Sequence, residues 1–436
     1  MTSSSPARAY GPLSLTMRVA LGASLGALMV SGCAGQTTIR YDREQLAQSL
    51  DDPSDESAVV LGEFALEKVI DGDTIRVVGI DETLRLLAID TEETFKSEKA
   101  RRAFEQGWET YLTEAQLERK GKPVKIPTPL GEDAKKWAEE FFKGVRRVRL
   151  ERDSPDEIRG RYNRLLTYVY AKKDGEWVNY NIESVRAGMS PYFMKYGYST
   201  RFHDEFVAAQ EEARAAQRGI WDPDKQHYLD YDLRLAWWTR RAEFIAAFKR
   251  EAADKNNYIV LTAWDAERQL KEHLHREVVI LATVGDIRER EGNKPTRVNL
   301  SRRMFGDFPL IFFDEDVYAS SGIAKSKGDF VRVRGVVSKY RNKHTGKDVV
   351  QIQVDLPAQV SRDPDQGPPR ILPGDAAWPL GGGALVDASP PPQDEEPPPA
   401  VTRPDPALAA PVVETPSEAE APDEAMAPQP IPTSRP

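Results

Sequence analysis

The sequence predicts an α+β chain, mainly β, that carries two small five-stranded OB-type barrels and ends in a disordered tail. Apolar and polar residues alternate in five short runs within residues 61–173, and in five more within residues 276–354. The tail is predicted from composition, because 20 of the 32 Pro residues follow Asp363 and such a segment buries too little apolar surface to fold.

The first block of runs has the order of an OB-type Greek-key barrel, with a helix between the third and fourth strands. The strands are expected at residues 63–70, 74–78, 83–89, 144–152 and 164–172, and the intervening helix at residues 132–144. Residues 95–130 are charged and are interpreted as a loop or a partly helical insertion. Further helices are expected at residues 178–189, 202–221 and 232–254.

The second block predicts a smaller barrel with strands at residues 276–290, 296–301, 308–313, 329–340 and 348–354, and a short helix at residues 314–321. Its last part resembles the closing strands of nucleic-acid-binding OB domains. Basic residues and aromatic residues there could line a groove for a phosphate backbone, or could be a solvated strand face with core aromatics. These residues are Lys325, Lys327, Arg332, Arg334, Lys339, Arg341, Lys343, Lys347, Phe305, Phe308 and Tyr340.

The N-terminus has the layout of a secretory signal. Arg8 and Arg18 precede a short apolar run that ends in Val-Ser-Gly-Cys, and this run is too short to span a bilayer comfortably. That ending resembles a bacterial lipobox, and Cys33 is the only Cys in the chain. We expect Cys33 to be lipidated and to tether the exported protein to a membrane. The tethered protein would face the periplasm or the cell exterior. The alternative is an ordinary signal peptide or a monotopic anchor, with an incidental Cys.

The chain therefore divides into six expected parts. They are a lipoprotein signal peptide (1–33), a tether (34–60), the first barrel domain (61–222), a connecting helix (223–255), the second barrel (256–362) and the Pro-rich acidic tail (363–436). The tail holds 13 acidic and 3 basic residues, a net charge of −10, so the rest of the chain carries +1 of the total of −9. Overall acidity thus does not exclude an anionic partner such as nucleic acid for the folded part.

Acidic residues gather at two places in the first barrel. Asp71-Gly72-Asp73 is typical of a tight hairpin turn in which Gly supplies unusual backbone angles, and Asp90 ends the third strand. If adjacent strands bring Asp73 and Asp90 together, the two carboxylates repel unless a cation such as Mg²⁺ or Ca²⁺ joins them. Glu92 and Glu93 could each supply a general base.

Arginines complete a phosphodiester-hydrolysing set. Arg85 shares a strand with Asp90, and a second Arg is available in the run Arg-Tyr-Asn-Arg-Leu-Leu at residues 161–166. A guanidinium group donates two parallel hydrogen bonds to phosphate oxygens, and a metal with a base can activate water.

These motifs, in this order, resemble the staphylococcal (thermonuclease-like) nuclease family over roughly residues 61–222. The matching segments are VIDGDTIRV, LRLLAIDTEET, RYNRLLTYVY, VNYNIESVRAGM and AQRGIW. The resemblance implies a calcium-dependent, sugar-nonspecific endonuclease that acts on DNA or RNA and leaves 3′-phosphate ends.

The resemblance also implies a role for each matching residue. Asp73, Asp90 and the carbonyl of Thr91 would bind Ca²⁺, and Glu93 would activate water. Arg85 and Arg164 would bind the phosphate. The residues implied to bind other parts of the substrate are Arg161 and Tyr162, at a terminal phosphate, and Tyr196, which would stack on a base.

The sequence departs from the family pattern near these residues. Glu92 replaces a Pro, so two adjacent Glu residues could compete for the base role, and Asn163 and Leu165 replace small Gly residues beside Arg164. The insertion at 95–130 makes its loop about 26 residues longer than the resemblance implies. A noncatalytic surface protein that binds nucleic acid or another protein through its two barrels is therefore the alternative function.

The expected lipid anchor can be tested at one residue. If Cys33 carries the lipid, Cys33→Ser removes the attachment site, and we expect the protein to leave the membrane fraction or to remain unprocessed. Membrane fractionation with immunoblotting measures both outcomes. Normal processing with unchanged membrane retention would contradict the lipobox interpretation.

Overall fold

The computed structural model describes residues 59–80, 82–154, 165–263, 265–301, 307–341 and 346–379, all within one compact unit of the chain. The described ranges do not include six of the residues singled out from the sequence, namely Cys33, Arg161, Tyr162, Arg164, Phe305 and Lys343. Within these ranges, no helix combines the length and the apolar character needed to cross a membrane.

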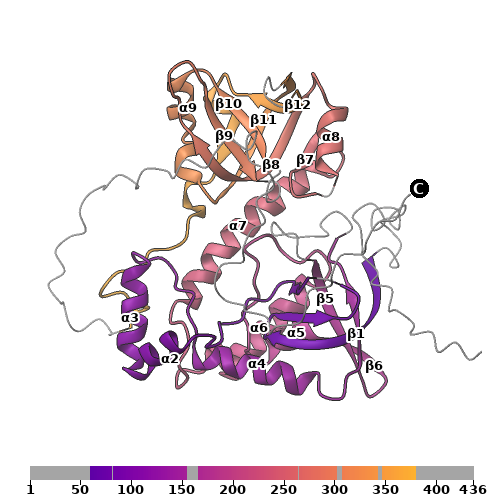
Figure 1. Cartoon of the computed structure of the whole chain (residues 1–436), viewed down its shortest axis with the longest axis vertical. Coiled ribbons are helices and arrows are strands. Elements are labelled where there is room, and N and C mark those ends of the chain that lie inside the picture. Colours follow the sequence, from indigo (N-terminus) through magenta and orange to yellow (C-terminus); the bar gives the residue numbers. More distant parts are fainter. Residues whose placement is uncertain are drawn as a thin grey trace, which may run out of the picture. The chain divides into compact units, whose positions relative to one another are not determined.

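Five strands of the first block form a closed ring (Figure 1). They are β1 (Val60–Asp71), β2 (Thr74–Val77), β3 (Leu84–Leu86), β4 (Arg147–Glu151) and β5 (Leu166–Lys173). The order is β3-β2-β1-β4-β5, and β3 pairs in parallel with β5 to close the ring. All five predicted strands are present. Apolar side chains that alternate along them, among them Ile75 and Val77, are fully buried in the barrel core.

A sixth strand, β6 (Glu176–Asn179), extends the sheet beside β5. The sequence predicts a helix from residue 178, but the helix begins at Tyr180. The reason is the turn Asp174-Gly175, in which both residues adopt positive φ, of 49° and 93°. An Asp-Gly pair in this conformation is a favoured two-residue hairpin connection.

Six helical segments surround this first sheet. They are α2 (Glu98–Glu105), α3 (Trp108–Glu118), α4 (Pro129–Phe141), α5 (Tyr180–Arg186), α6 (His203–Ala215) and the 3-10 turn η2 (Gly219–Trp221). Three helices lie between the third and fourth strands. One is α4, the helix expected there, and the other two, α2 and α3, make the insertion partly helical, which is one of the two interpretations of its sequence. The insertion shares a small separate core with residues that precede and begin α7, and this core includes Leu112, Val124, Tyr228 and Tyr231.

The helix expected at residues 232–254 is present as α7 (Tyr231–Ala252), and the second barrel repeats the topology of the first. Its strands run β8-β9-β10-β12-β11 and close through β11–β8, with β10 and β12 parallel. They are β8 (Glu277–Arg288), β9 (Thr296–Ser301), β10 (Phe308–Phe312), β11 (Phe330–Arg341) and β12 (Asp348–Gln353). The further elements are β7 (Tyr258–Val260), α8 (Ala266–Glu272), α9 (Glu315–Ser321), η3 (Ile323–Ser326), η4 (Pro357–Gln359) and β13 (Val360–Arg362).

The first residues of the expected tail are folded, which differs from the sequence analysis. Residues 363–379 include the 3-10 turn η5 (Pro364–Gln366), and Gln366 is fully buried. The Gln366 side chain exchanges two hydrogen bonds with the backbone of Phe330. The backbone carbonyl of Gln366 accepts a hydrogen bond of 2.6 Å from Trp237 Nε1. These specific polar contacts hold a segment whose Pro-rich composition alone predicts disorder.

Arg241 joins α7, the second barrel and this C-terminal segment. Its Nη1 lies 2.7 Å from Asp329 Oδ1, and its Nη2 donates to the Gly328 carbonyl at 3.1 Å. It also donates to the carbonyls of Gln366 and, in the first domain, Lys195. Burial lowers the pKa of Arg241 and raises the pKa of Asp329, so both groups lose hydration when the pair forms.

We therefore expect the two partners to depend strongly on each other. Arg241→Met or Asp329→Leu alone leaves a buried charge unpaired and should cost about 3–5 kcal/mol in the free energy of unfolding. The double variant should cost clearly less than the sum of the two single variants. Urea unfolding measures all three, with Arg240→Met, at an exposed neighbouring site, as the control. Additive costs would show that the buried pair is not a unit.

Candidate active site

Arg85 lies between the two predicted metal-binding carboxylates. Thr74, the residue after Asp73, pairs with Arg85 across β2 and β3, and Asp90 follows β3. Arg85 Nη1 contacts Asp73 Oδ2, its Nη2 contacts Asp90 Oδ1, and Nη2 also donates to the Ile89 carbonyl at 3.3 Å. The sequence predicts that a cation joins the two acids, and in this structure the Arg85 guanidinium joins them.

The charges in this cluster stabilise one another. Burial by itself would lower the pKa of Arg85, but the Asp73 and Asp90 carboxylates outweigh it and raise that pKa. Burial would likewise raise the pKa of Asp90, but Lys125 and Arg85 hold it below its usual range. Arg85 and Asp90 are therefore both charged at neutral pH.

The two acids of the Asp-Gly-Asp turn have different roles. Asp71 faces inward, where its carboxylate accepts a hydrogen bond of 3.1 Å from the Gly72 N–H and lies 3.4 Å from Lys96 Nζ. Asp73 points to Arg85. Gly72 does not adopt positive φ, contrary to the sequence analysis. It is needed for space, because a Cβ there would lie 2.8 Å from Thr91 Cγ2.

Several contacts fix the backbone that carries Asp90. Ala88 adopts a left-handed conformation with φ of 60°, and its carbonyl accepts a hydrogen bond of 2.9 Å from Phe193 N. Ser190 Oγ accepts a hydrogen bond of 2.8 Å from Asp90 N. Non-Gly residues rarely adopt positive φ, so tertiary contacts from the segment after α5 must hold Ala88 in this conformation.

The side chains of Glu92 and Glu93 differ in their exposure to solvent. Arg85 with Asp73 and Asp90 forms the acid–arginine cluster. The Glu93 side chain is 34 % exposed and lies at this cluster, where its Oε1 is 3.3 Å from Lys125 Nζ. Glu92 is almost completely buried. Gly131 in α4 brings the helix against this segment, since a Cβ there would lie 2.0 Å from the Glu93 carbonyl oxygen. Of the two, only Glu93 is placed to accept a proton from a solvent water.

Glu92 instead organises distant parts of the chain. Its Oε1 accepts hydrogen bonds of 2.7 Å from Tyr228 N and from Tyr231 OH, and its Oε2 accepts one from Thr128 Oγ1 at the N-cap of α4. Burial raises the pKa of Glu92 in spite of these donors. The residue that departs from the family pattern therefore ties the insertion and the start of α7 to the active-site segment.

Lys125 is the functional candidate that sequence reasoning missed. It belongs to the insertion, and its Nζ lies 3.2 Å from Asp90 Oδ1 as well as 3.3 Å from Glu93 Oε1. Burial would lower the pKa of Lys125, but the Asp90 and Glu93 carboxylates raise it. The sequence holds a weak signal in the basic run Lys-Gly-Lys-Pro-Val-Lys, but nothing in that run distinguishes Lys125 from its neighbours.

Tyr196 is the predicted base-stacking residue, and it lies in the described part of the chain. Tyr196 is 63 % exposed, with its ring edge-on to Phe193. Neighbouring Lys195 lies over the Trp237 ring, 4.7 Å from its centroid, and burial together with the Arg241 charge lowers its pKa to about 8. An exposed ring beside a cation can stack on a base. Arg161, Tyr162 and Arg164 cannot be placed, because they lie outside the described residues.

The donor set fits a hard divalent cation. The carboxylate oxygens of Asp73 and Asp90 and the carbonyl of Thr91 are ligands of the kind that Ca²⁺ prefers. Among the described residues, no group of three or more His, Cys, Asp or Glu side chains could hold a metal by itself. The protein would thus supply part of a coordination shell, which water or substrate oxygens would complete.

Several basic side chains on the strands of the second barrel pair with acidic neighbours among the described residues. Arg332 pairs with Glu251, Arg334 with Glu277, and both Lys339 and Arg341 approach Asp348. Phe308 is buried in the core, whereas Tyr340 is 41 % exposed. Of the two interpretations left open for this barrel, the described contacts favour a solvated strand face with a core aromatic.

The raised pKa of Glu92 makes stability depend on pH. The unfolded chain releases this proton near pH 4.5, before the folded protein does, so ionisation of Glu92 lowers the free energy of unfolding as pH rises. Glu92→Gln cannot ionise and keeps an oxygen acceptor. We expect its stability relative to the parent to increase between pH 4.5 and pH 8 in urea unfolding.

Glu92→Ala is the companion variant. It leaves three buried donors without an acceptor and should cost about 3 kcal/mol or more at every pH. If the difference between Glu92→Gln and the parent stays flat or shrinks as pH rises, Glu92 is not a buried acid with a raised pKa.

Comparison with known proteins shows that part of this chain is similar to a described family. Residues 83–223 match the family model "Staphylococcal nuclease homologue". The chain is 29 % identical over 188 residues to Endonuclease YncB of Bacillus subtilis, covering 43 % of this chain and 74 % of that protein. It is 31 % identical over 163 residues to SPbeta prophage-derived endonuclease YokF of Bacillus subtilis, covering 37 % and 44 %, respectively.

A third relative is Thermonuclease of Staphylococcus intermedius, 28 % identical over 169 residues, which are 38 % of this chain and 80 % of that protein. The matched range contains Arg85, Asp90, Glu93 and Lys125, whereas Asp73 precedes it on the hairpin that completes the barrel. The chain thus contains a staphylococcal-nuclease-like domain at residues 83–223, followed by a second small β-barrel.

Proposed function

We propose that this chain is a calcium-dependent, sugar-nonspecific endonuclease that hydrolyses phosphodiester bonds of DNA or RNA. One observation carries the proposal. Within a nuclease-like domain, Arg85 bridges Asp73 and Asp90, and the exposed carboxylate of Glu93 lies at the same cluster. A guanidinium group, hard oxygen ligands and an exposed base are the groups that phosphodiester hydrolysis needs.

Each group has a distinct task in this reaction. Glu93 accepts a proton from the water that attacks phosphorus, and Arg85 donates hydrogen bonds to the phosphate oxygens as charge develops on them. Asp73, Asp90 and the Thr91 carbonyl hold the divalent cation, which when bound neutralises charge on the phosphate. The water oxygen bonds to phosphorus, and the bond from phosphorus to the 5′-oxygen breaks. The departing 5′-oxygen takes up a proton, and the phosphate remains on the 3′-oxygen.

The remaining substrate contacts are proposed from the family resemblance. Arg164 supplies a second guanidinium to the phosphate, and Arg161 and Tyr162 contact a terminal phosphate. Tyr196 stacks on a base, for which its exposure is suitable.

We also propose that the protein is exported and tethered to a membrane through lipidated Cys33. The support is the sequence Val-Ser-Gly-Cys after a short apolar run and the absence of any other Cys. Under this proposal the nuclease acts on nucleic acid in the periplasm or outside the cell.

One contact favours a second candidate function, the binding of nucleic acid without cleavage. Lys125 pairs with Glu93, the proposed base, and a base held in an ion pair is less available to activate water. If that contact persisted with substrate bound, the domain would bind nucleic acid without cleaving it. Retained DNA binding with no cation-stimulated cleavage would establish this alternative.

The nuclease proposal is tested with plasmid DNA, with and without Ca²⁺. We expect the parent protein to degrade the plasmid only with the cation, and Glu93→Gln to lower turnover by about 100-fold or more, because it removes the general base. Glu109→Gln, an exposed acid on the insertion, is the control and should match the parent. Intact plasmid under both conditions with the parent would overturn the proposal.

A further inference from the structure

Lys125 brings a cation into the active site from a segment that the family resemblance does not account for. Its ammonium group contacts one oxygen of Asp90, a proposed metal ligand, and one oxygen of Glu93, the proposed base. The same Asp90 oxygen also receives Arg85 Nη2. One carboxylate oxygen is therefore shared by two cations from different parts of the chain.

The backbone on both sides of Lys125 is anchored. The Val124 carbonyl accepts a hydrogen bond of 2.6 Å from Arg234 Nη2. Ile126 exchanges two hydrogen bonds with the Tyr228 hydroxyl, at 3.0 Å and 2.6 Å. Both anchors belong to the chain after residue 223, and Arg234 is itself buried and paired with Asp230. The position from which the Lys125 side chain extends is therefore fixed by α7 and the segment before it.

Two more contacts hold the rest of this segment. The Glu93 carbonyl accepts a hydrogen bond of 3.0 Å from Thr128 N, so the insertion returns directly to the segment that carries Asp90 and Glu93. The Gly121 carbonyl accepts one of 2.7 Å from Ile371 N in the C-terminal segment. A Cβ on Gly121 would lie 2.8 Å from the Ile371 carbonyl oxygen, so the two backbones meet closely. Such anchoring is typical of a positioned residue and not of a surface lysine.

An ammonium group and a divalent cation compete at such a place. They would need the same Asp90 carboxylate, and like charges within a few ångströms repel strongly where water is partly excluded. The Lys125 side chain is 47 % exposed, so its flexible stem can move the ammonium into solvent when another cation arrives. Arg85, held by two carboxylates and a carbonyl, is less free to move.

We propose that Lys125 is a built-in competitor of the divalent cation, and that it sets the metal affinity of the site through Asp90 and Glu93. The inference rests on the proposed function, because it takes Asp90 as a metal ligand. Metal binding displaces the ammonium group from both carboxylates, which also releases Glu93 to act as a base. The insertion thus makes the nuclease respond to higher cation concentrations than the domain would without Lys125.

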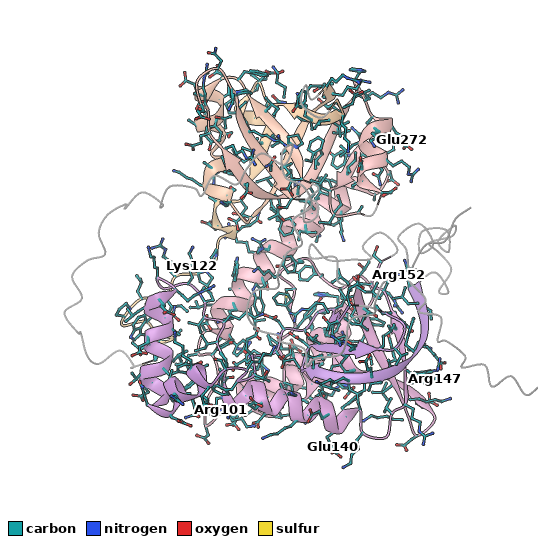
Figure 2. The ribbon with its side chains drawn as sticks, in the orientation of Figure 1. Arg101, Lys122, Glu140, Arg147, Arg152 and Glu272 are labelled. Carbon is teal, nitrogen blue, oxygen red and sulfur yellow. The ribbon has the colours of Figure 1, made fainter. Side chains whose placement is uncertain are left out.

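The test is calorimetric titration of the full-length chain with Ca²⁺ in the absence of nucleic acid. Lys125→Met removes the charge and keeps an unbranched side chain, and we expect it to bind Ca²⁺ about tenfold or more tightly than the parent. Lys125→Arg keeps the charge and should stay within about threefold of the parent. Lys122→Met is the matched control, since Lys122 is an exposed lysine of the same insertion (Figure 2) and should leave the affinity unchanged.

The outcomes separate this inference from the proposed function. Tighter Ca²⁺ binding by Lys125→Met supports the inference even if no variant cleaves DNA, a result that would overturn only the nuclease proposal. Equal or weaker binding by Lys125→Met overturns the inference even if the parent is an active nuclease. If neither the parent nor Lys125→Met binds Ca²⁺ at millimolar concentration, the inference is overturned, because no metal site then exists for Lys125 to control.

Discussion

The contact of Arg85 with Asp73 and Asp90 is the interaction on which the rest of the site depends. Arg85 lies in β3, a short strand that pairs with β2 on one side and with β5 on the other, and so closes the barrel. Closure of the sheet and assembly of the charged cluster are therefore one event. Carboxylates this poorly exposed need a paired cation, because burying them alone would cost several kcal/mol. The barrel supplies that cation from its own closing strand.

Much of the fold could be predicted because it is encoded locally. Alternation over a few residues marks the strands of both barrels, and the Asp-Gly-Asp turn and the end of β3 place Asp73 and Asp90 on neighbouring strands. What could not be predicted depends on partners far away in the sequence. By composition Gln366 belongs to a Pro-rich tail, but in the folded protein its hydrogen bonds with Phe330 and Trp237 hold it in place. The Asp174-Gly175 turn was a local signal that the sequence analysis did not use.

The site shows the same division between local and distant information. Asp73, Arg85, Asp90 and Glu93 converge from one stretch of about twenty residues, so their motif indicates their proximity. Lys125 joins them only because Arg234 and Tyr228, more than 100 residues later, hold its flanking backbone. Composition could mark the insertion as basic, but it could not select one lysine from several. Residues that act through long-range packing leave no spacing pattern to find.

Glu92 and Glu93 show how the added segments and the nuclease-like domain have become interdependent. The two adjacent side chains point to opposite sides of one strand-like segment, one into the protein and one to the acid–arginine cluster. The inward carboxylate receives its Tyr228 and Tyr231 donors from beyond residue 223, where the family match ends. A domain cut at that boundary would keep every proposed catalytic group but would lose two of the three donors to Glu92. The anchors of Lys125 would be lost with them. The functional unit in this chain therefore extends past the matched domain and includes the start of α7.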